Sequence, residues 1–133
     1  MRFLLDTNAC IQLLRRGKGA SIRKRLEVSG VETVVCSIVR SELVYGALRS
    51  ERPEHNLDKV KALLSPFQSL PFDDAAAQHA ADIRASLTGR GKTIGPYDIL
   101  IAAIARANGL AVVTHNVAEF SRIAGLQVDD WEA

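Results

Sequence analysis

Four acidic residues stand where their carboxylates could gather around a metal ion. Asp6 follows a short apolar run at the N-terminus, and Asp98 comes directly before Ile99–Ala105, in which every residue is apolar. Glu42 and Glu119 each lie a few residues after a β-branched stretch. A carboxylate cluster in which neither His nor Cys recurs suits a hard cation such as Mg²⁺ or Mn²⁺. Such a cation lowers the pKa of bound water and neutralises charge on a phosphate, which is the chemistry of phosphodiester hydrolysis.

Two of these acids also have an ordinary structural explanation. An aspartate after a strand is often the N-cap of the next helix, although Thr7 or Asn8 could fill that role as well as Asp6. Pro96 suits the first position of a helix, which makes Asp98 a first-turn acid favoured by the helix dipole. The apolar run after Asp98 nevertheless indicates a buried or cleft-lining helix end, where an ionised carboxylate needs a partner or a cation.

The other two acids can be explained in the same way. Glu42 would be a solvated helix residue, and Glu119 would be an acid in the first turn of a short helix. Asn116 would be a cap or turn residue after the strand that ends near Thr114. Each signal is weak by itself, and the combination is what favours a metal site.

The elements that must position these residues alternate between strands and helices. Strands are expected at residues 2–5, 33–37, 68–72, 110–114 and 126–128. Helices are expected at residues 8–15, 21–29, 37–50, 53–64, 74–88, 96–109 and 117–122. Several strands have no polar face, which favours an α/β fold with a parallel sheet covered by helices on both sides. In such a sheet, ligands bind at the carboxyl ends of the strands.

Local signals set some of these boundaries. Ser21, Ser37 and Asp73 are expected to cap the helices that follow them. Pro71 removes a backbone donor from the weak strand at residues 68–72, which suits an edge strand or a strand end.

Composition and length predict one soluble globular domain over residues 1–133. Hydrophobic residues make up 47% of the chain and charged residues 24%, and no repeat or linker divides it. The net charge of +2 does not by itself predict a polyanionic partner. The segment from Arg15 to Arg25, however, holds six cations and no acid, so it is either a phosphate-binding patch or a solvated helix face.

The cysteines and histidines form no metal-ligand pattern in the sequence. Cys10 and Cys36 lie in apolar segments without CxxC spacing, so we expect small core residues rather than a disulfide or zinc pair. His55, His79 and His115 are scattered, so surface roles are the default. No signal peptide or membrane-length apolar run is present, which predicts a cytoplasmic protein.

Four ordered motifs resemble those of a known family. "LLDTN" (4–8), "SELVYG" (41–46), "GPYDILIAAIA" (95–105) and "VVTHNVAEF" (112–120) are similar to the motifs of PIN-domain ribonucleases. The resemblance covers nearly the whole chain and extends to VapC toxins of type II toxin–antitoxin modules. The tract "IRASLTGRGKTIGPYD" (83–98) and the ending "GLQVDDW" (125–131) resemble the VapC subgroup that cleaves initiator tRNA.

The resemblance implies a fold, a site and partners. The fold would be a PIN-like α/β/α sandwich with a mostly parallel sheet. Asp6 and Asp98 match the aspartates that hold Mg²⁺ or Mn²⁺, and Glu42 matches the glutamate that completes the acidic pocket, directly or through metal-bound water. The chain would be a homodimeric endoribonuclease that acts on tRNA, inhibits translation and is neutralised by a VapB-like antitoxin whose tail enters the acidic groove.

One position departs from the family pattern. Many PIN domains carry an aspartate where this chain has Asn116, and Glu119, one turn further on, could supply the fourth carboxylate of the catalytic site. This departure leaves open whether a second metal ion binds. Thr7, Asn8, Thr114 and Asn116 adjoin the acids in the sequence, and we expect them to support the active site.

Two alternative functions remain at this point. A catalytically inactive PIN-like module could bind RNA or a protein, but it would have no use for carboxylates that repel one another. A receiver-like signalling domain also gathers acids and Mg²⁺ at strand ends. It would need an aspartate after a central strand and a lysine after a late one, whereas "TVVCS" (33–37) ends without an acid and "VVTHN" (112–116) without a lysine.

Overall fold

The computed structural model describes residues 2–28 and 31–132 and contains one parallel sheet. Its strands are β1 (Arg2–Leu5), β2 (Glu32–Cys36), β3 (Ser69–Leu70), β4 (Ala111–Val113) and β5 (Gln127–Asp129). They are ordered β3-β2-β1-β4-β5, and every neighbouring pair is parallel. The predicted α/β class with a mostly parallel sheet is confirmed.

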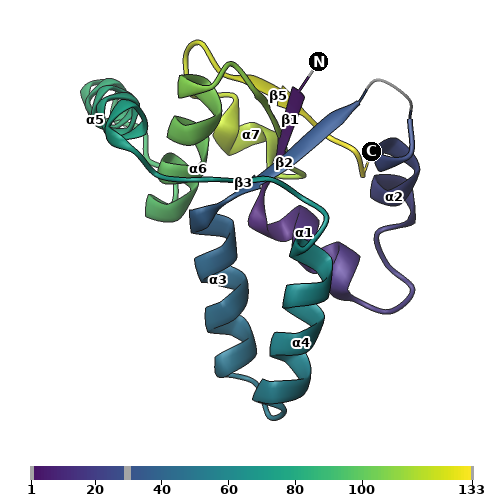
Figure 1. Cartoon of the computed structure of the whole chain (residues 1–133). Helices are drawn as coiled ribbons and strands as arrows, with labels where there is room; N and C mark the ends of the chain where they lie inside the picture. Colours follow the sequence, from purple (N-terminus) through teal and green to yellow (C-terminus); the bar gives the residue numbers. More distant parts are fainter. Residues whose placement is uncertain (1, 29–30, 133) are drawn as a thin grey trace.

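Seven helices within the described residues connect and cover the strands. They are α1 (Thr7–Leu14), α2 (Ala20–Leu26), α3 (Ser37–Leu48), α4 (Pro53–Leu64), α5 (Asp74–Gly89), α6 (Pro96–Ala107) and α7 (Val117–Phe120). Figure 1 shows α5 and α6 on one side of the strands and α2 on the other, while α3 and α4 extend as a pair away from the sheet. No helix in the described part of the chain is long and apolar enough to cross a membrane.

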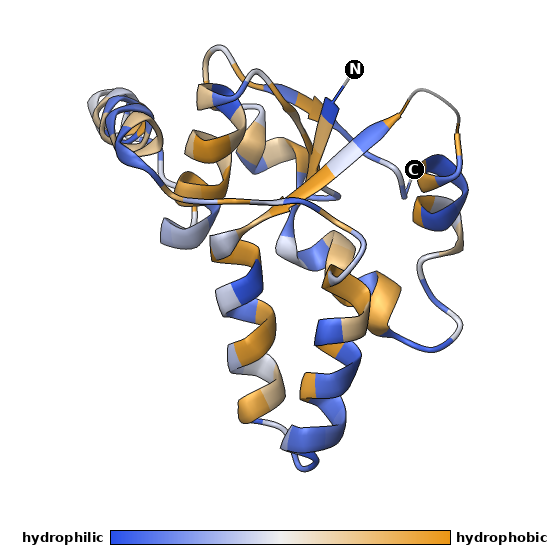
Figure 2. Ribbon diagram, viewed as in Figure 1, coloured by the Kyte–Doolittle hydropathy of each residue, from blue (hydrophilic) through white to orange (hydrophobic). Residues whose placement is uncertain are grey.

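The apolar pattern of the sequence explains which helices are buried. All five residues of Ile101–Ala105 in α6 are fully buried, as the apolar run predicted. On α3 the predicted stripe of Val39, Leu43 and Ala47 faces the core. Figure 2 shows α3 and α4 with alternating hydrophilic and hydrophobic patches, as expected for helices that bury only one face. Cys10 and Cys36 are buried free thiols, which confirms the prediction for both.

Three predicted caps can be compared with the structure, and one of them is confirmed. Asp73 caps α5 by accepting a hydrogen bond from the Ala76 N–H at 2.9 Å. Ser21 lies inside α2, whose N-cap is Gly19 in the left-handed conformation. Ser37 is the first residue of α3 rather than its cap, because β2 runs directly into the helix at Cys36.

Several element boundaries differ from the prediction by a few residues. The first helix begins at Thr7, the helix at α2 ends at Leu26, and its predicted end at Ser29 lies outside the described residues. The weak strand at 68–72 shrinks to Ser69–Leu70 and pairs only at the sheet edge, as Pro71 suggested. Gly89, predicted as a loop residue, is the last residue of α5.

The strand order creates a switch point at the centre of the sheet. From β1 the chain moves outward through β2 to β3, and it then returns to place β4 against the other side of β1. In parallel sheets a crevice forms at this point, beyond the carboxyl ends of the two strands. Asp6 follows β1 and Thr114 follows β4, so both residues lie at this crevice.

Candidate active site

Asp6 is held at the switch point by three hydrogen bonds. Its backbone N–H donates to the Val113 carbonyl at 3.1 Å, which continues the pairing of β1 with β4. Its Oδ1 accepts from the Ala9 N–H at 2.8 Å, and the Thr114 hydroxyl also bonds to its side chain. Asp6 is therefore the N-cap of α1, as its ordinary explanation proposed, and neither Thr7 nor Asn8 takes that place.

The pKa of the Asp6 carboxyl is unusually high for an N-cap residue. The residue is only 2% exposed, and burial raises the pKa of Asp6 to about 6 against the lowering effect of Thr114 and Ala9. The charges of Asp98 and Glu132 raise it further. A bound cation would offset the repulsion among these carboxylates. Capping of α1 alone does not require the neighbouring acids.

Asp98 reaches the site from the first turn of α6. It is the third residue of α6, next to the apolar run that anchors the helix. Burial raises the pKa of Asp98 to about 6, and the nearby charges of Glu42 and Glu119 add to the rise. A Cβ at Gly95 would come within 3.2 Å of the Asp98 Oδ2, so glycine at that position leaves room for the carboxylate.

Glu42 is oriented by a residue of the neighbouring helix. The Thr7 hydroxyl at the start of α1 donates to the Glu42 Oε1 at 2.6 Å. This bond joins the first and second motifs, which are 35 residues apart in the sequence. Asn8 is exposed and makes no side-chain hydrogen bond to any residue that the structure describes, so its supporting role stays a prediction.

Glu119 is oriented by the residue that departs from the family pattern. The Asn116 side-chain amide donates to the Glu119 Oε2 at 2.7 Å, and the Asn116 N–H donates to the Thr114 Oγ1 at 2.9 Å. Asn116 thus connects Thr114, which bonds to Asp6, with Glu119, whose charge reaches Asp98. The Asn116 amide cannot neutralise the charge of a metal ion. It does fix the position of the Glu119 carboxylate, which could neutralise that charge.

The donor set fits one hydrated divalent cation. The side-chain atoms that face one another here are carboxylate and hydroxyl oxygens, the ligands that Mg²⁺ prefers. Among the described residues, no three of Asp6, Glu42, Asp98 and Glu119 have oxygen atoms within 4.8 Å of one another. This spacing suits a cation bound by one or two carboxylates with the other positions taken by water.

The structure adds three residues that sequence reasoning missed. His115, Asp130 and Glu132 each offer a ligand atom, and these atoms lie within 4.8 Å of one another. His115 is exposed, as the default surface role predicted, and its Nδ1 is 3.1 Å from Asp130 Oδ2. The charge of Glu132 also raises the pKa of Asp6. The pairing of the edge strand β5 with β4 brings this C-terminal segment to the site. No local sequence pattern predicted that placement.

The basic segment 15–25 is partly used for structure. Arg23 donates to the carbonyls of Lys18 and Leu13, each at 2.7 Å, and so holds the loop between α1 and α2. Arg25 pairs with Asp129 at 3.4 Å, and its guanidinium lies over the Trp131 ring at 5.5 Å. These two cations are engaged within the protein, which reduces the patch available to phosphates.

In EDTA, the free energy of unfolding should fall as the pH rises from about 4 to 7. The pKa values of Asp6 and Asp98 are raised from 3.8 to about 6, so the folded protein binds protons that the unfolded chain releases. This stability is present at low pH and is lost as the pH rises through the folded pKa. Asp6→Asn keeps the capping oxygen and should add about 2 kcal/mol at pH 7.

Urea unfolding of the wild type and Asp6→Asn between pH 4 and 7 measures this difference. Asp58→Asn, at an exposed position on α4, is the control and should follow the wild type. An Asp6→Asn protein less stable than the wild type at pH 7 would contradict the assigned repulsion.

Comparisons with known proteins agree in family and in fold. Residues 3–126 match the PIN domain family model. The chain is 41% identical over 131 residues to the tRNA(fMet)-specific endonuclease VapC of Shigella flexneri, covering 98% of both chains. A crystal structure of DNA-bound VapBC from Salmonella typhimurium matches with 42% identity, a TM-score of 0.91 and 98% coverage of each chain.

A further solved structure is similar over the whole chain. VapBC2 from Rickettsia felis, bound to a DNA fragment from its promoter, matches with 31% identity and a TM-score of 0.93. The match covers 99% of this chain and 100% of that one. The PIN-like fold expected from the four motifs is confirmed.

Proposed function

The chain belongs to the PIN-domain family, and from that premise we propose that it is a metal-dependent endoribonuclease that hydrolyses phosphodiester bonds in tRNA. The observation that carries the proposal is the meeting of Asp6 and Asp98 at the switch point. Burial raises the pKa of both carboxyls to about 6, and the charges of neighbouring carboxylates raise it further. Family membership removes the receiver-like alternative. An inactive PIN-like module remains the competing hypothesis, and the assay below tests it.

We assign the metal to Asp6 and Asp98. When bound there, Mg²⁺ or Mn²⁺ would activate a water molecule and offset the charge that develops on the phosphate. Asp6 is suited to hold the cation because the Ala9 N–H and the Thr114 hydroxyl fix its carboxylate. Asp98 is fixed by its place at the start of the buried helix α6.

Glu42 and Glu119 would complete the catalytic set. The Thr7 hydroxyl occupies the Glu42 Oε1, which leaves Oε2 as the atom that can accept a proton from water. The Asn116 amide occupies the Glu119 Oε2 and leaves Oε1 for a similar contact. Thr7, Thr114 and Asn116 act as positioning residues in this scheme, since each holds a carboxylate in place.

The substrate assignment rests on the relatives. The Shigella flexneri protein is named a tRNA(fMet)-specific endonuclease, and the Salmonella typhimurium relative, 42% identical over 131 residues, carries the same name. We therefore propose initiator tRNA as the substrate and inhibition of translation as the consequence of its cleavage. The cytoplasm, where translation takes place, is the proposed location.

Purified protein should cut initiator tRNA in Mg²⁺ and leave elongator methionine tRNA intact. The measurement is cleavage of total tRNA followed by sequencing of the new ends, with elongator tRNA as the matched control within one reaction. A chain that binds tRNA in Mg²⁺ but produces no new ends would support the inactive module. Cleavage confined to another tRNA would retain the enzyme and replace the substrate.

We further propose that a VapB-like antitoxin binds this chain. A groove of about 450 Å³ runs between α1, α3 and α4 and reaches Glu42. Its floor is apolar and includes Ile11 and Val60, while Arg15 and Lys59 line its sides. An antitoxin segment lying here would cover a catalytic carboxylate, which accounts for inhibition by direct obstruction.

A homodimer is the proposed assembly. Tyr45 and Leu48 on α3 and Tyr97 on α6 are large side chains that are each more than half exposed, at 62%, 57% and 58%. Large exposed hydrophobic side chains on neighbouring helices are typical of a protein interface. The predicted single domain, residues 1–133, would be one subunit of this dimer.

A further inference from the structure

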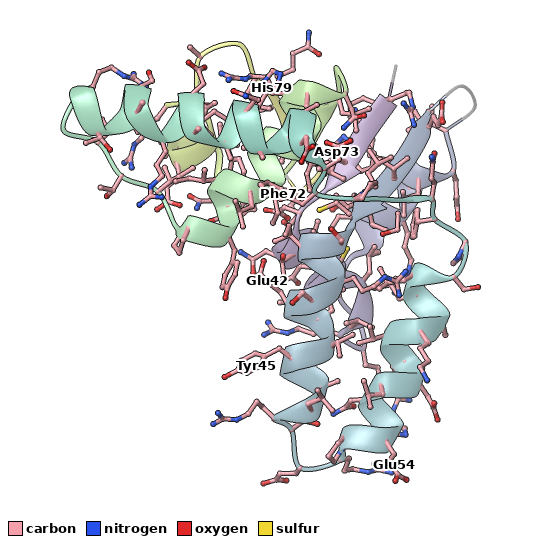
Figure 3. All side chains as sticks on the ribbon, turned by 60° about the vertical axis from the view of Figure 1, so that its left-hand side comes forward. Glu42, Tyr45, Glu54, Phe72, Asp73 and His79 are labelled. Carbon is pink, nitrogen blue, oxygen red and sulfur yellow. The ribbon has the colours of Figure 1, made fainter. Side chains whose placement is uncertain are left out.

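A groove separate from the acidic crevice lies between α5, α6 and the loop that joins them. It has a volume of about 570 Å³ and is lined by thirteen residues that lie between Phe72 and Leu100 in the sequence. Its floor is apolar, and the side chains that form it include Phe72, Ala80, Leu87, Ile94 and Leu100. Figure 3 shows Phe72 where the chain leads into α5, above Glu42 of α3.

The rim of this groove is positively charged. Arg84 on α5 and Lys92 in the loop are exposed, and Thr88 and Thr93 add hydroxyl groups beside them. The groove has no acidic lining residue among those that the structure describes. Neither Arg84 nor Lys92 makes a side-chain hydrogen bond or ion pair with any described residue. Their cationic groups are thus available to an anionic ligand.

Other arginines of the same region are engaged within the protein. Arg106 donates to the His79 Nδ1 at 2.8 Å and pairs with Asp82 at 2.7 Å. Arg122 donates to the Thr93 carbonyl at 2.7 Å. Arg84 and Lys92 stand apart from these structural contacts, and both face the groove.

The groove adjoins the candidate active site through α6. Pro96 and Ile99 line the groove, and Asp98 lies between them in the first turn of the same helix. With about 100° between successive helix residues, Asp98 leaves α6 on roughly the opposite side from Pro96 and Ile99, so the groove and the acidic crevice flank the first turn of α6.

We propose that this groove binds one unstacked nucleotide of the RNA substrate, on the other side of the α6 N-terminus from the phosphate that is cut. The proposal rests on the ribonuclease function proposed above. A nucleobase has apolar faces that match the floor, and its phosphate matches Arg84 and Lys92 on the rim. The groove would thereby help select substrates in which the cut lies in a loop, since a base within a duplex cannot leave its stack without cost.

A second copy of the chain fits the groove less well than RNA does. In a dimer whose two-fold axis passes through the groove, the cationic rim would face its own copy without an acid from the groove to balance it. A polyanion meets no such repulsion. The charge pattern therefore favours a nucleotide over a self-association surface.

Two variants test the groove, one through charge and one through shape. The double variant Arg84→Gln/Lys92→Gln should raise KM for tRNA about tenfold and leave kcat within about twofold, because it removes phosphate contacts outside the acidic crevice. Ala81→Phe, at an exposed position on α5 that lines the groove, should fill the space for the base and raise KM similarly. Both are measured with an initiator tRNA transcript, or with whichever tRNA the total-tRNA assay shows to be cut.

Each variant has a matched control. Arg52→Gln/Lys61→Gln removes the same charge from exposed positions at the two ends of the α4 segment. Ala85→Phe adds the same ring to an exposed residue of α5 that does not line the groove. Both controls should keep KM within about twofold. Loss of the contact with this one phosphate should also lower the slope of log KM against log salt by roughly 0.7 in the double variant alone.

The outcomes separate this proposal from the function on which it rests. A wild-type chain that cuts no RNA overturns both. A chain that cuts tRNA while the groove variants match their controls overturns only the groove assignment. Variants that leave KM unchanged but alter the sedimentation of the protein identify the groove as a contact between copies, which also overturns the assignment.

Discussion

Asp98→Asn is expected to reduce the rate of tRNA cleavage in Mg²⁺ by at least about a hundredfold. The amide keeps the size of the side chain but loses the negative charge that would hold the cation. Folding should be retained, since α6 is anchored by the buried run Ile101–Ala105 rather than by its first turn. The measurement is single-turnover cleavage of initiator tRNA, with circular dichroism as the test of folding.

The matched control is Asp74→Asn. Asp74 and Asp98 are both acids in the first turn of a helix, so both interact with a helix dipole. Asp74 is exposed on α5, and its replacement should leave the cleavage rate within about twofold. Wild-type cleavage by a folded Asp98→Asn protein would reduce Asp98 to a helix-start residue and remove the metal assignment.

Removal of divalent metal is expected to abolish cleavage altogether. Asp6 and Asp98 repel each other in the empty site, and without a cation nothing in the site offsets the charge of a phosphate brought beside them. EDTA should bring the rate to background, and an excess of Mg²⁺ or Mn²⁺ should restore it. Monovalent salt at equal ionic strength is the control for a general charge effect.

Metal binding should also be visible without RNA. A ligand that binds only the folded protein stabilises it, by about 2.7 kcal/mol at a concentration one hundred times its Kd. Mg²⁺ should therefore raise the melting temperature of the wild type and have no such effect on Asp98→Asn. Full cleavage in EDTA, or an equal shift in both proteins, would exclude the proposed metal site.

The parts of the fold that depend on local patterns were predictable from the sequence. The fully apolar run in α6 and the stripe on α3 could be identified from periodicity alone, and both are buried. The first residues of helices were harder to predict, because a serine near a helix start suits the N-cap whether it lies at the cap or inside the first turn. Ser37 was misplaced for this reason: β2 passes into α3 without a turn, so no capping residue intervenes.

Most residues of the candidate site could be named from the sequence, but the contacts among them could not. Asp6, Glu42, Asp98 and Glu119 could be found because each follows a strand or opens a helix. Their supports depend on tertiary contacts that no local pattern encodes. The Thr7–Glu42 bond spans 35 residues, and the C-terminal Glu132 reaches Asp6 only because β5 pairs with β4.

The central place of β1 has a consequence for the protein during its own synthesis. β1 is made before the strand on one of its sides, β4, which begins only at Ala111. Because translation proceeds from the N-terminus, Asp6 cannot acquire its bonds to Val113 and Thr114 until these residues have left the ribosome. We expect the nascent chain to be inactive until β4 has emerged and paired with β1.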